Sequence, residues 1–138
     1  MDVAVEGRRS EIPDPAVVIL LDTNAVIWLD QNHPRTRRLA RSASRLFVSP
    51  ATLLELQLLE EIGRLRLRAR ARGIVESDRW ELDEPPAVDW FEQAADESWT
   101  RDPFDRLIVA HARVRGFRLA SADAAILERV RPSERIDL

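Results

Sequence analysis

The sequence predicts an α/β fold with a central parallel sheet. Short apolar runs rich in β-branched residues alternate with longer segments of helical periodicity, the pattern of repeated strand–helix units. The clearest run, in residues 17–22 (VVILLD), is continuously apolar up to Asp22, as expected of a strand buried on both faces of a sheet. The chain has 138 residues, which favours one domain with a proper hydrophobic core.

The further elements follow in order along the chain. Helices are expected over residues 24–30, 34–43, 49–63, 85–98, 102–116 and 124–130, and strands over residues 45–50, 117–123 and 134–138. Capping residues support these boundaries. Ser49 and Pro50 suit the start of one helix and Gly63 its end, while Gly116 suits the end of another.

The beginning of the chain is expected to differ from the rest. Residues 1–15 contain Pro13 and Pro15 and predict a flexible extension, so the folded domain is expected over residues 16–138. The first residues include acids and lack an apolar core segment, so no signal peptide is predicted. The apolar run 16–21 is too short to cross a bilayer, and we expect a cytoplasmic protein with no membrane contact.

Composition excludes several chemistries. There is no cysteine, so the chain has neither disulfides nor a thiolate metal site, and only two histidines are present. Any metal must therefore be held mainly by oxygen, which favours Mg²⁺ or Mn²⁺ over Zn²⁺. All 21 basic residues are arginine, which excludes a Schiff-base or phosphate-loop lysine, and the net charge of −3 gives no overall attraction to nucleic acid.

Residues 63–73 (GRLRLRARARG) have no single structural prediction. Arginine alternates with leucine or alanine, which is typical of a strand, but the composition suits a helix equally well. One interpretation of the five arginines is a solvated basic face. The other is a surface for phosphates or for an acidic partner.

Four acidic residues are expected at one edge of the sheet. Asp22 ends the first strand and Asp123 follows a later one, and ligands of open parallel sheets bind beyond the carboxyl ends of strands. Asp105 lies in the first turn of its helix, and Glu55 interrupts a nearly apolar helix. Each acid has a structural explanation of its own: helix capping, interaction with a helix dipole, or, for Glu55, the wet face of a helix. Their convergence predicts a divalent cation that neutralises them, the arrangement for metal-assisted hydrolysis of a phosphodiester.

The segments LLDTNAVIWL, SPATLLELQLL and DPFDRLIVAHARVRGFRLASAD closely resemble the PIN domain, and within it the VapC-type ribonuclease toxins of bacterial toxin–antitoxin pairs. The resemblance covers residues 17–138 and implies a three-layer α/β/α sandwich. It implies RNA cleavage with Mg²⁺ or Mn²⁺, a cognate antitoxin partner and a homodimer. By matching position, the catalytic and metal-binding acids are Asp22, Glu55, Asp105 and Asp123.

Further residues are predicted around these acids. Asp102 is expected first to cap the helix that begins at Pro103, and only second to assist the metal. Arg106 is expected to contact substrate phosphate or a partner's carboxylate, or to form a plain salt bridge. Residues expected to orient waters or carboxylates are Thr23, Asn24 and Ser121.

The alternative function is a non-catalytic PIN-like module that binds nucleic acid or protein, which the intact set of four acids disfavours. His111 is expected on the surface or in the packing of its helix rather than as a ligand.

Overall fold

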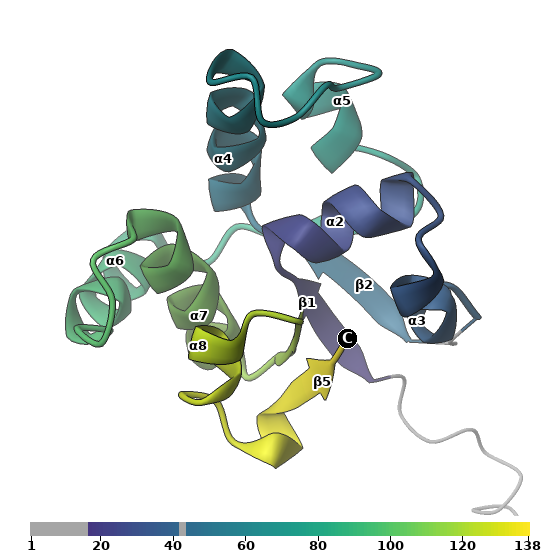
Figure 1. Cartoon of the computed structure of the whole chain (residues 1–138). Helices are drawn as coiled ribbons and strands as arrows, with labels where there is room; N and C mark the ends of the chain where they lie inside the picture. Colours follow the sequence, from purple (N-terminus) through teal and green to yellow (C-terminus); the bar gives the residue numbers. More distant parts are fainter. Residues whose placement is uncertain (1–16, 42–43) are drawn as a thin grey trace, which may run out of the picture.

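Five parallel strands form the centre of the computed structural model, which describes residues 17–41 and 44–138 (Figure 1). In chain order the strands are β1 (Val18–Leu21), β2 (Arg45–Val48), β3 (Glu81–Leu82), β4 (Arg118–Ser121) and β5 (Arg135–Asp137). Their spatial order is β3-β2-β1-β4-β5. Leu21 at the end of β1 pairs with Val48 of β2 and with Ala120 of β4. The central strands therefore end at a common edge, and the residues that follow them start close together.

Helices cover both faces of the sheet, so the predicted three-layer α/β/α sandwich is confirmed (Figure 1). One layer packs its apolar side chains with Ile19 and Leu21, and the other packs with Leu20. The first layer contains α2 (Thr23–Asp30), the 3₁₀ turn η1 (Pro34–Thr36), α3 (Arg37–Arg41) and α5 (Ala71–Val75). The second contains α6 (Ala87–Asp96), α7 (Pro103–Arg115) and α8 (Ala124–Leu127).

Helix α4 (Pro50–Glu61) joins the two layers. Its Leu56 belongs to the apolar cluster on one face of the sheet, and its Ala51 belongs to the cluster on the other. Ser49 caps this helix by accepting a hydrogen bond from the Ala51 N–H, as predicted. Gly63 follows the helix with φ +78°, a left-handed conformation that glycine adopts without steric cost.

Several local predictions differ from the structure. The segment expected as one helix over 34–43 begins as η1, where His33 accepts a hydrogen bond from the Arg35 N–H, and continues as α3. The helix expected over 124–130 is the single turn α8, followed by the 3₁₀ turn η2 (Pro132–Glu134). Strand β3 was not predicted, because two residues are too few to show an alternating pattern.

The unassigned segment 63–73 is mainly irregular and enters α5 at Ala71. The extension expected over residues 1–15 lies outside the described residues. Within the described ranges 17–41 and 44–138, no helix is both long enough and apolar enough to cross a membrane.

Candidate active site

Five carboxylates meet in one hollow at the carboxyl edge of the sheet. The hollow has a volume of about 140 Å³ and is lined by Asp22, Thr23, Asn24, Glu55, Asp102, Asp105, Ile108, Asp123 and Ile126. These residues come from the ends of β1 and β4 and from α2, α4, α7 and α8. The structure therefore brings together the four acids expected to act and most of the residues expected around them.

Three of these acids are also helix caps. Asp22 accepts a hydrogen bond from the Ala25 N–H at 2.8 Å, and Asp102 accepts from the N–H of Phe104 at 2.8 Å. Asp123 caps α8 through the Ala125 N–H at 2.8 Å. These acids therefore cap helices and also converge at one edge of the sheet, and both were predicted. The N-termini of three helices face the hollow, and their positive ends partly offset its negative charge.

Ser121 links two of the acids. Its side chain is completely buried and forms a hydrogen bond with the side chain of Asp22. Its Oγ also accepts a hydrogen bond from the backbone N–H of Asp123 at 3.0 Å. The Asp22 carboxylate is therefore held both by the start of α2 and by the end of β4, which fixes its orientation toward the hollow.

Glu55 is held by two threonines, one of which the sequence analysis missed. The Thr23 hydroxyl donates a hydrogen bond to Glu55 Oε1. The Oγ1 of Thr52 lies 3.2 Å from the Oγ1 of Thr23 and is fully buried, so Thr52 donates to Thr23 while Thr23 donates to Glu55. Thr52 lies three residues before Glu55, a spacing that puts both side chains on one face of α4.

Burial and mutual repulsion disfavour the charged forms of these acids. Burial raises the pKa of Asp22 from 3.8 to about 6, and the nearby charges of Glu55 and Asp123 add to the increase. The pKa of Asp105 rises to about 7, first through burial and then through the charges of the other four carboxylates. Burial also raises the pKa of Glu55, and the Asp102 charge adds to this effect.

The donor chemistry of the hollow fits a hard divalent cation. Its acids supply carboxylate oxygens, which Mg²⁺ and Mn²⁺ prefer, and it contains neither cysteine nor histidine. A cation would remove the repulsion that raises the pKa of Asp105. As placed in the described part of the chain, no three His, Asp or Glu side chains are grouped tightly enough to enclose an ion. The carboxylates would therefore have to move closer together to hold a cation.

The remaining predicted residues lie in different places. Asn24 is exposed at the rim of the hollow. Arg106 does not line it: its Nε donates to the Thr100 carbonyl at 2.8 Å. His111 lies six residues after Asp105 on α7 and is fully buried, and its Nε2 is 2.7 Å from Asp83 Oδ2, so its expected packing role is confirmed.

Under the metal-assisted hydrolysis predicted from the sequence, replacement of Thr52 by valine is expected to lower the activity roughly three- to tenfold, the value of one lost hydrogen bond. Valine keeps the shape of the side chain but leaves Thr23 without its donor, so Glu55 is less firmly placed. Thr36→Val is the matched control, because Thr36 is also buried but donates to the His33 carbonyl, away from the hollow. Equal activities of the two variants would contradict a positioning role for Thr52.

Parallel strands with a carboxylate hollow beyond their ends define an α/β domain with an acidic candidate site. The model of the PIN domain family matches residues 19–131. The chain belongs to the PIN domain family. A comparison with curated proteins finds no match.

Solved structures with a similar fold include VapBC proteins and a VapC toxin. VapBC-1 from nontypeable Haemophilus influenzae is 21% identical with a TM-score of 0.62, covering 88% of this chain and 98% of its own. VapBC2 from Rickettsia felis, bound to a promoter DNA fragment, is 17% identical with a TM-score of 0.60 and the same coverages. VapC20 from Mycobacterium tuberculosis, described as a toxin that cleaves the sarcin-ricin loop, is 24% identical with a TM-score of 0.60, covering 83% of this chain and 99% of its own.

Proposed function

We propose that the protein is a metal-dependent endoribonuclease and the toxin component of a type II toxin–antitoxin pair. The observation that carries this proposal is the convergence of five carboxylates in one hollow, with a strongly raised pKa for Asp22 and Asp105. A fold needs no such arrangement for stability, because repulsion and burial both oppose it. The toxin role and the RNA substrate are supported by membership of the PIN family and by the similarity to VapC20.

In this function, the metal is held by Asp22, Glu55, Asp105 and Asp123. A bound Mg²⁺ or Mn²⁺ supplies positive charge at the phosphate and acidifies water for phosphodiester hydrolysis. Thr23, supported by Thr52, keeps Glu55 directed into the hollow, and Ser121 does the same for Asp22.

Asp102 has a different role from Asp105. It caps α7 by accepting hydrogen bonds from the N–H groups of Phe104 and Asp105, and its charge raises the pKa of Asp105. Asn24 at the rim is placed to contact a substrate or an ordered water. Ile108 and Ile126 form apolar walls of the hollow.

The partners that we propose are an RNA substrate and a cognate antitoxin protein, with a second copy of the chain in a homodimer. The antitoxin is supported by the similarity to VapC-type complexes. The alternative, a non-catalytic PIN-like module that binds nucleic acid or protein, keeps the fold but does not require the acids.

A cleavage assay on total RNA, with Mg²⁺ or with a chelator, separates these functions. Asp105→Asn is expected to reduce Mg²⁺-dependent cleavage to the level seen with chelator. It removes the one carboxylate whose pKa is raised by the charges of all four others. Asp102→Asn is the matched control and is expected to retain activity within about tenfold, since asparagine is an equally good helix cap. Intact RNA with the unaltered protein, at every Mg²⁺ and Mn²⁺ concentration, would favour the non-catalytic alternative.

A further inference from the structure

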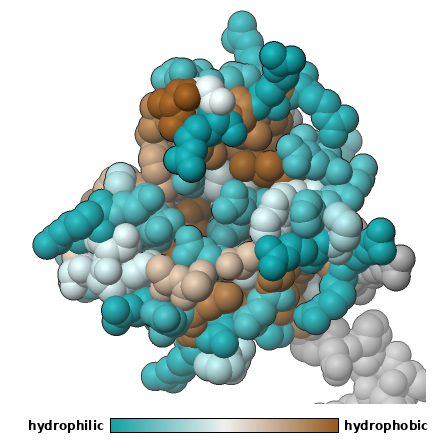
Figure 2. Space-filling view, in the orientation of Figure 1, coloured by the Kyte–Doolittle hydropathy of each residue, from teal (hydrophilic) through white to brown (hydrophobic). Residues whose placement is uncertain are grey.

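The segment between α4 and α5 separates its side chains by type. Leu65 and Leu67 are half-buried and pack against the apolar core on the α2 side of the sheet. The arginines that alternate with them are exposed: Arg64, Arg66, Arg68 and Arg70. Hydrophilic residues stand out at the top of the molecule in Figure 2, the end that carries α4 and α5 in Figure 1. From Arg64 to Arg68 the alternation seen in the sequence thus acts as it does in a strand, although the described part of the chain shows no strand paired with it. The buried leucines fix the backbone that presents the arginines.

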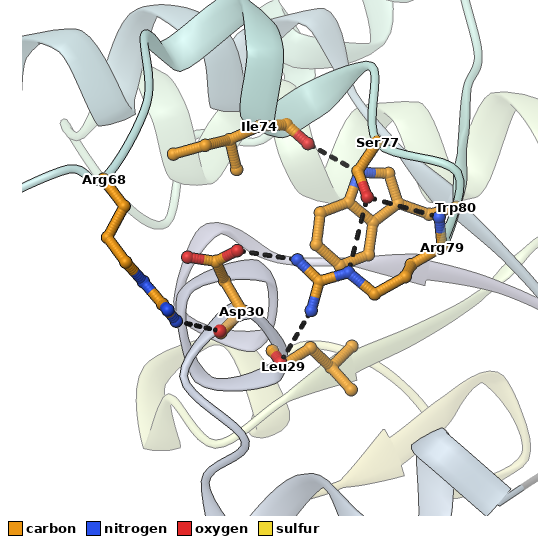
Figure 3. Close-up of polar contacts among 7 residues, drawn as sticks. All are labelled: Leu29, Asp30, Arg68, Ile74, Ser77, Arg79 and Trp80. Carbon is orange, nitrogen blue, oxygen red and sulfur yellow. Dashed lines mark hydrogen bonds and ion pairs between the residues drawn. The ribbon is translucent and has the colours of Figure 1, made fainter.

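Two arginines hold the end of α2 (Figure 3). Arg68 donates from Nη2 to the Asp30 carbonyl at 2.7 Å. Arg79, which comes from beyond α5, donates to the Leu29 carbonyl at 3.1 Å and forms an ion pair of 2.6 Å with Asp30. These cations lie at the negative end of the helix, where they are favourable. The segment is therefore attached to the helix whose other end begins at the acidic hollow.

Three other arginines in this segment have no polar partner for their side chains. Within the described residues, the side chains of Arg64, Arg66 and Arg70 have neither a hydrogen-bond partner nor an ion-pair partner. The acids around them are already engaged. Asp30 pairs with Arg79, Glu76 pairs with Arg72, Glu61 accepts from Gln57, and Glu60 accepts from the Leu67 N–H.

Helix α2 relates this segment to the acidic hollow. At its start α2 contributes Asn24 to the hollow, and at its end Asp30 lines a small depression together with Arg66 and Arg68. From Asn24 to Asp30 the axis of α2 rises about 9 Å. A strand of RNA with one phosphate at the carboxylates would therefore reach Arg66 within a few nucleotides.

We infer that the exposed arginines of residues 64–70 form a phosphate-binding surface that holds the RNA backbone beside the acidic site. This inference rests on the proposed function. A carboxylate hollow in a chain of net charge −3 repels a polyanion, so cations outside it are needed to retain RNA. Arg64 and Arg66 alternate with the half-buried leucines, and alternate residues of an extended chain are roughly 7 Å apart. Cations spaced in this way suit the repeating charge of a nucleic-acid backbone better than the uneven charges of a protein.

The test replaces Arg64, Arg66 and Arg70 with glutamine in the full-length chain. Binding of a fluorescent single-stranded RNA of mixed sequence is measured by anisotropy at several salt concentrations, with EDTA present to prevent cleavage. Loss of three phosphate contacts is expected to reduce the slope of log K against log salt by about 2. The control carries Arg37→Gln, Arg38→Gln and Arg131→Gln, which make the same change in net charge at exposed positions on other elements.

The inference holds if only the first triple variant loses affinity and slope while its melting temperature stays within a few degrees of the parent. Equal slopes for the two triple variants would overturn it, as would a parent chain that does not bind RNA. Affinity for polyglutamate is measured in the same way. If the first triple variant binds RNA as the parent does but loses affinity for polyglutamate, the inference is overturned in favour of an acidic protein partner. The binding assay contains EDTA and does not depend on catalysis. If the first triple variant has the reduced salt slope but the parent chain shows no Mg²⁺-dependent cleavage, the proposed function alone is rejected.

Discussion

Asp22→Asn is expected to abolish Mg²⁺-dependent RNA cleavage and, at the same time, to make the metal-free protein more stable. The first effect follows from the loss of a proposed metal ligand. The second follows from burial, because the pKa of Asp22 rises from 3.8 to about 6 and its charged form is disfavoured in the folded protein. Asparagine keeps the acceptor for the Ala25 N–H and caps α2 equally well, so the fold is retained.

The gain in stability depends on pH in a defined direction. Below pH 3.8 Asp22 is protonated in both the folded and the unfolded chain, so its charge costs nothing. The cost grows as the pH rises from 3.8 to about 6, where the unfolded chain has lost the proton that the folded chain still holds, and it is complete above about pH 7. There, the free energy of unfolding of Asp22→Asn is expected to exceed that of the parent by up to about 3 kcal/mol.

Chemical denaturation at pH 4 and pH 7.5 measures this difference, and added Mn²⁺ provides the control. Mn²⁺ at a hundred times its dissociation constant should stabilise the parent by about 2.7 kcal/mol, and should stabilise the variant far less. Mg²⁺-dependent cleavage by Asp22→Asn would show that Asp22 is not needed for the reaction. A stability difference that is equal at both pH values would show that the carboxylate is not buried as described.

Asp83→Ala is expected to lower the free energy of unfolding by about 2 to 3 kcal/mol, since it leaves the buried Nε2–H of His111 without an acceptor. Burial lowers the pKa of His111 below 6.5, so the ring is neutral and donates to Asp83 as a hydrogen bond rather than as a full ion pair. Asp83 also accepts from Arg115 Nε at 2.9 Å, and these bonds hold α7 against the segment after β3.

Glu84→Ala is the matched control for this variant. Glu84 is the exposed neighbour of Asp83, and it contributes only its backbone carbonyl to Arg115. Thermal and urea unfolding of both variants check the prediction. A loss of stability as large for Glu84→Ala as for Asp83→Ala would contradict the role of the His111 hydrogen bond.

The pair of His111 and Asp83 also predicts how the stability of the unaltered protein changes at low pH. The lowered pKa of His111 means that the unfolded chain binds a proton below pH 6.5 that the folded chain does not, so stability falls as the pH drops through this range. The pKa of Asp83 is also lowered, chiefly by hydrogen bonds from His111 and Arg115 that outweigh its burial, so its contribution is lost below pH 3.8.

Local signals in the sequence predicted the main elements because each signal has a physical cause within a few residues. The apolar, β-branched run of β1 is typical of a strand that is buried on both faces of a sheet. Asp102, Pro103 and Gly116 mark the two ends of α7. Asp22 and Asp123 follow strands that the sequence identified, so their common edge was predictable once the sheet was taken to be parallel.

Other features were outside the reach of those signals. Strand β3 exists only because Glu81 and Leu82 pair with Phe47 and Val48, and two residues carry no pattern of their own. Thr52 looks like any helix residue until the fold brings the Thr23 hydroxyl to 3.2 Å from it. His111 lay on an amphipathic helix, and its buried bond to Asp83 joins positions 28 residues apart.

The sequence by itself determined the class of fold, the order of the longer elements and which acids begin helices or follow strands, since periodicity and capping are properties of neighbouring residues. Only the tertiary structure decided how the acids share one hollow, which hydroxyls hold them, and that leucines turn the arginines of residues 64–70 outward beside α2. Burial, repulsion and hydrogen bonding between distant residues depend on distances in space, which the order of residues along the chain does not contain.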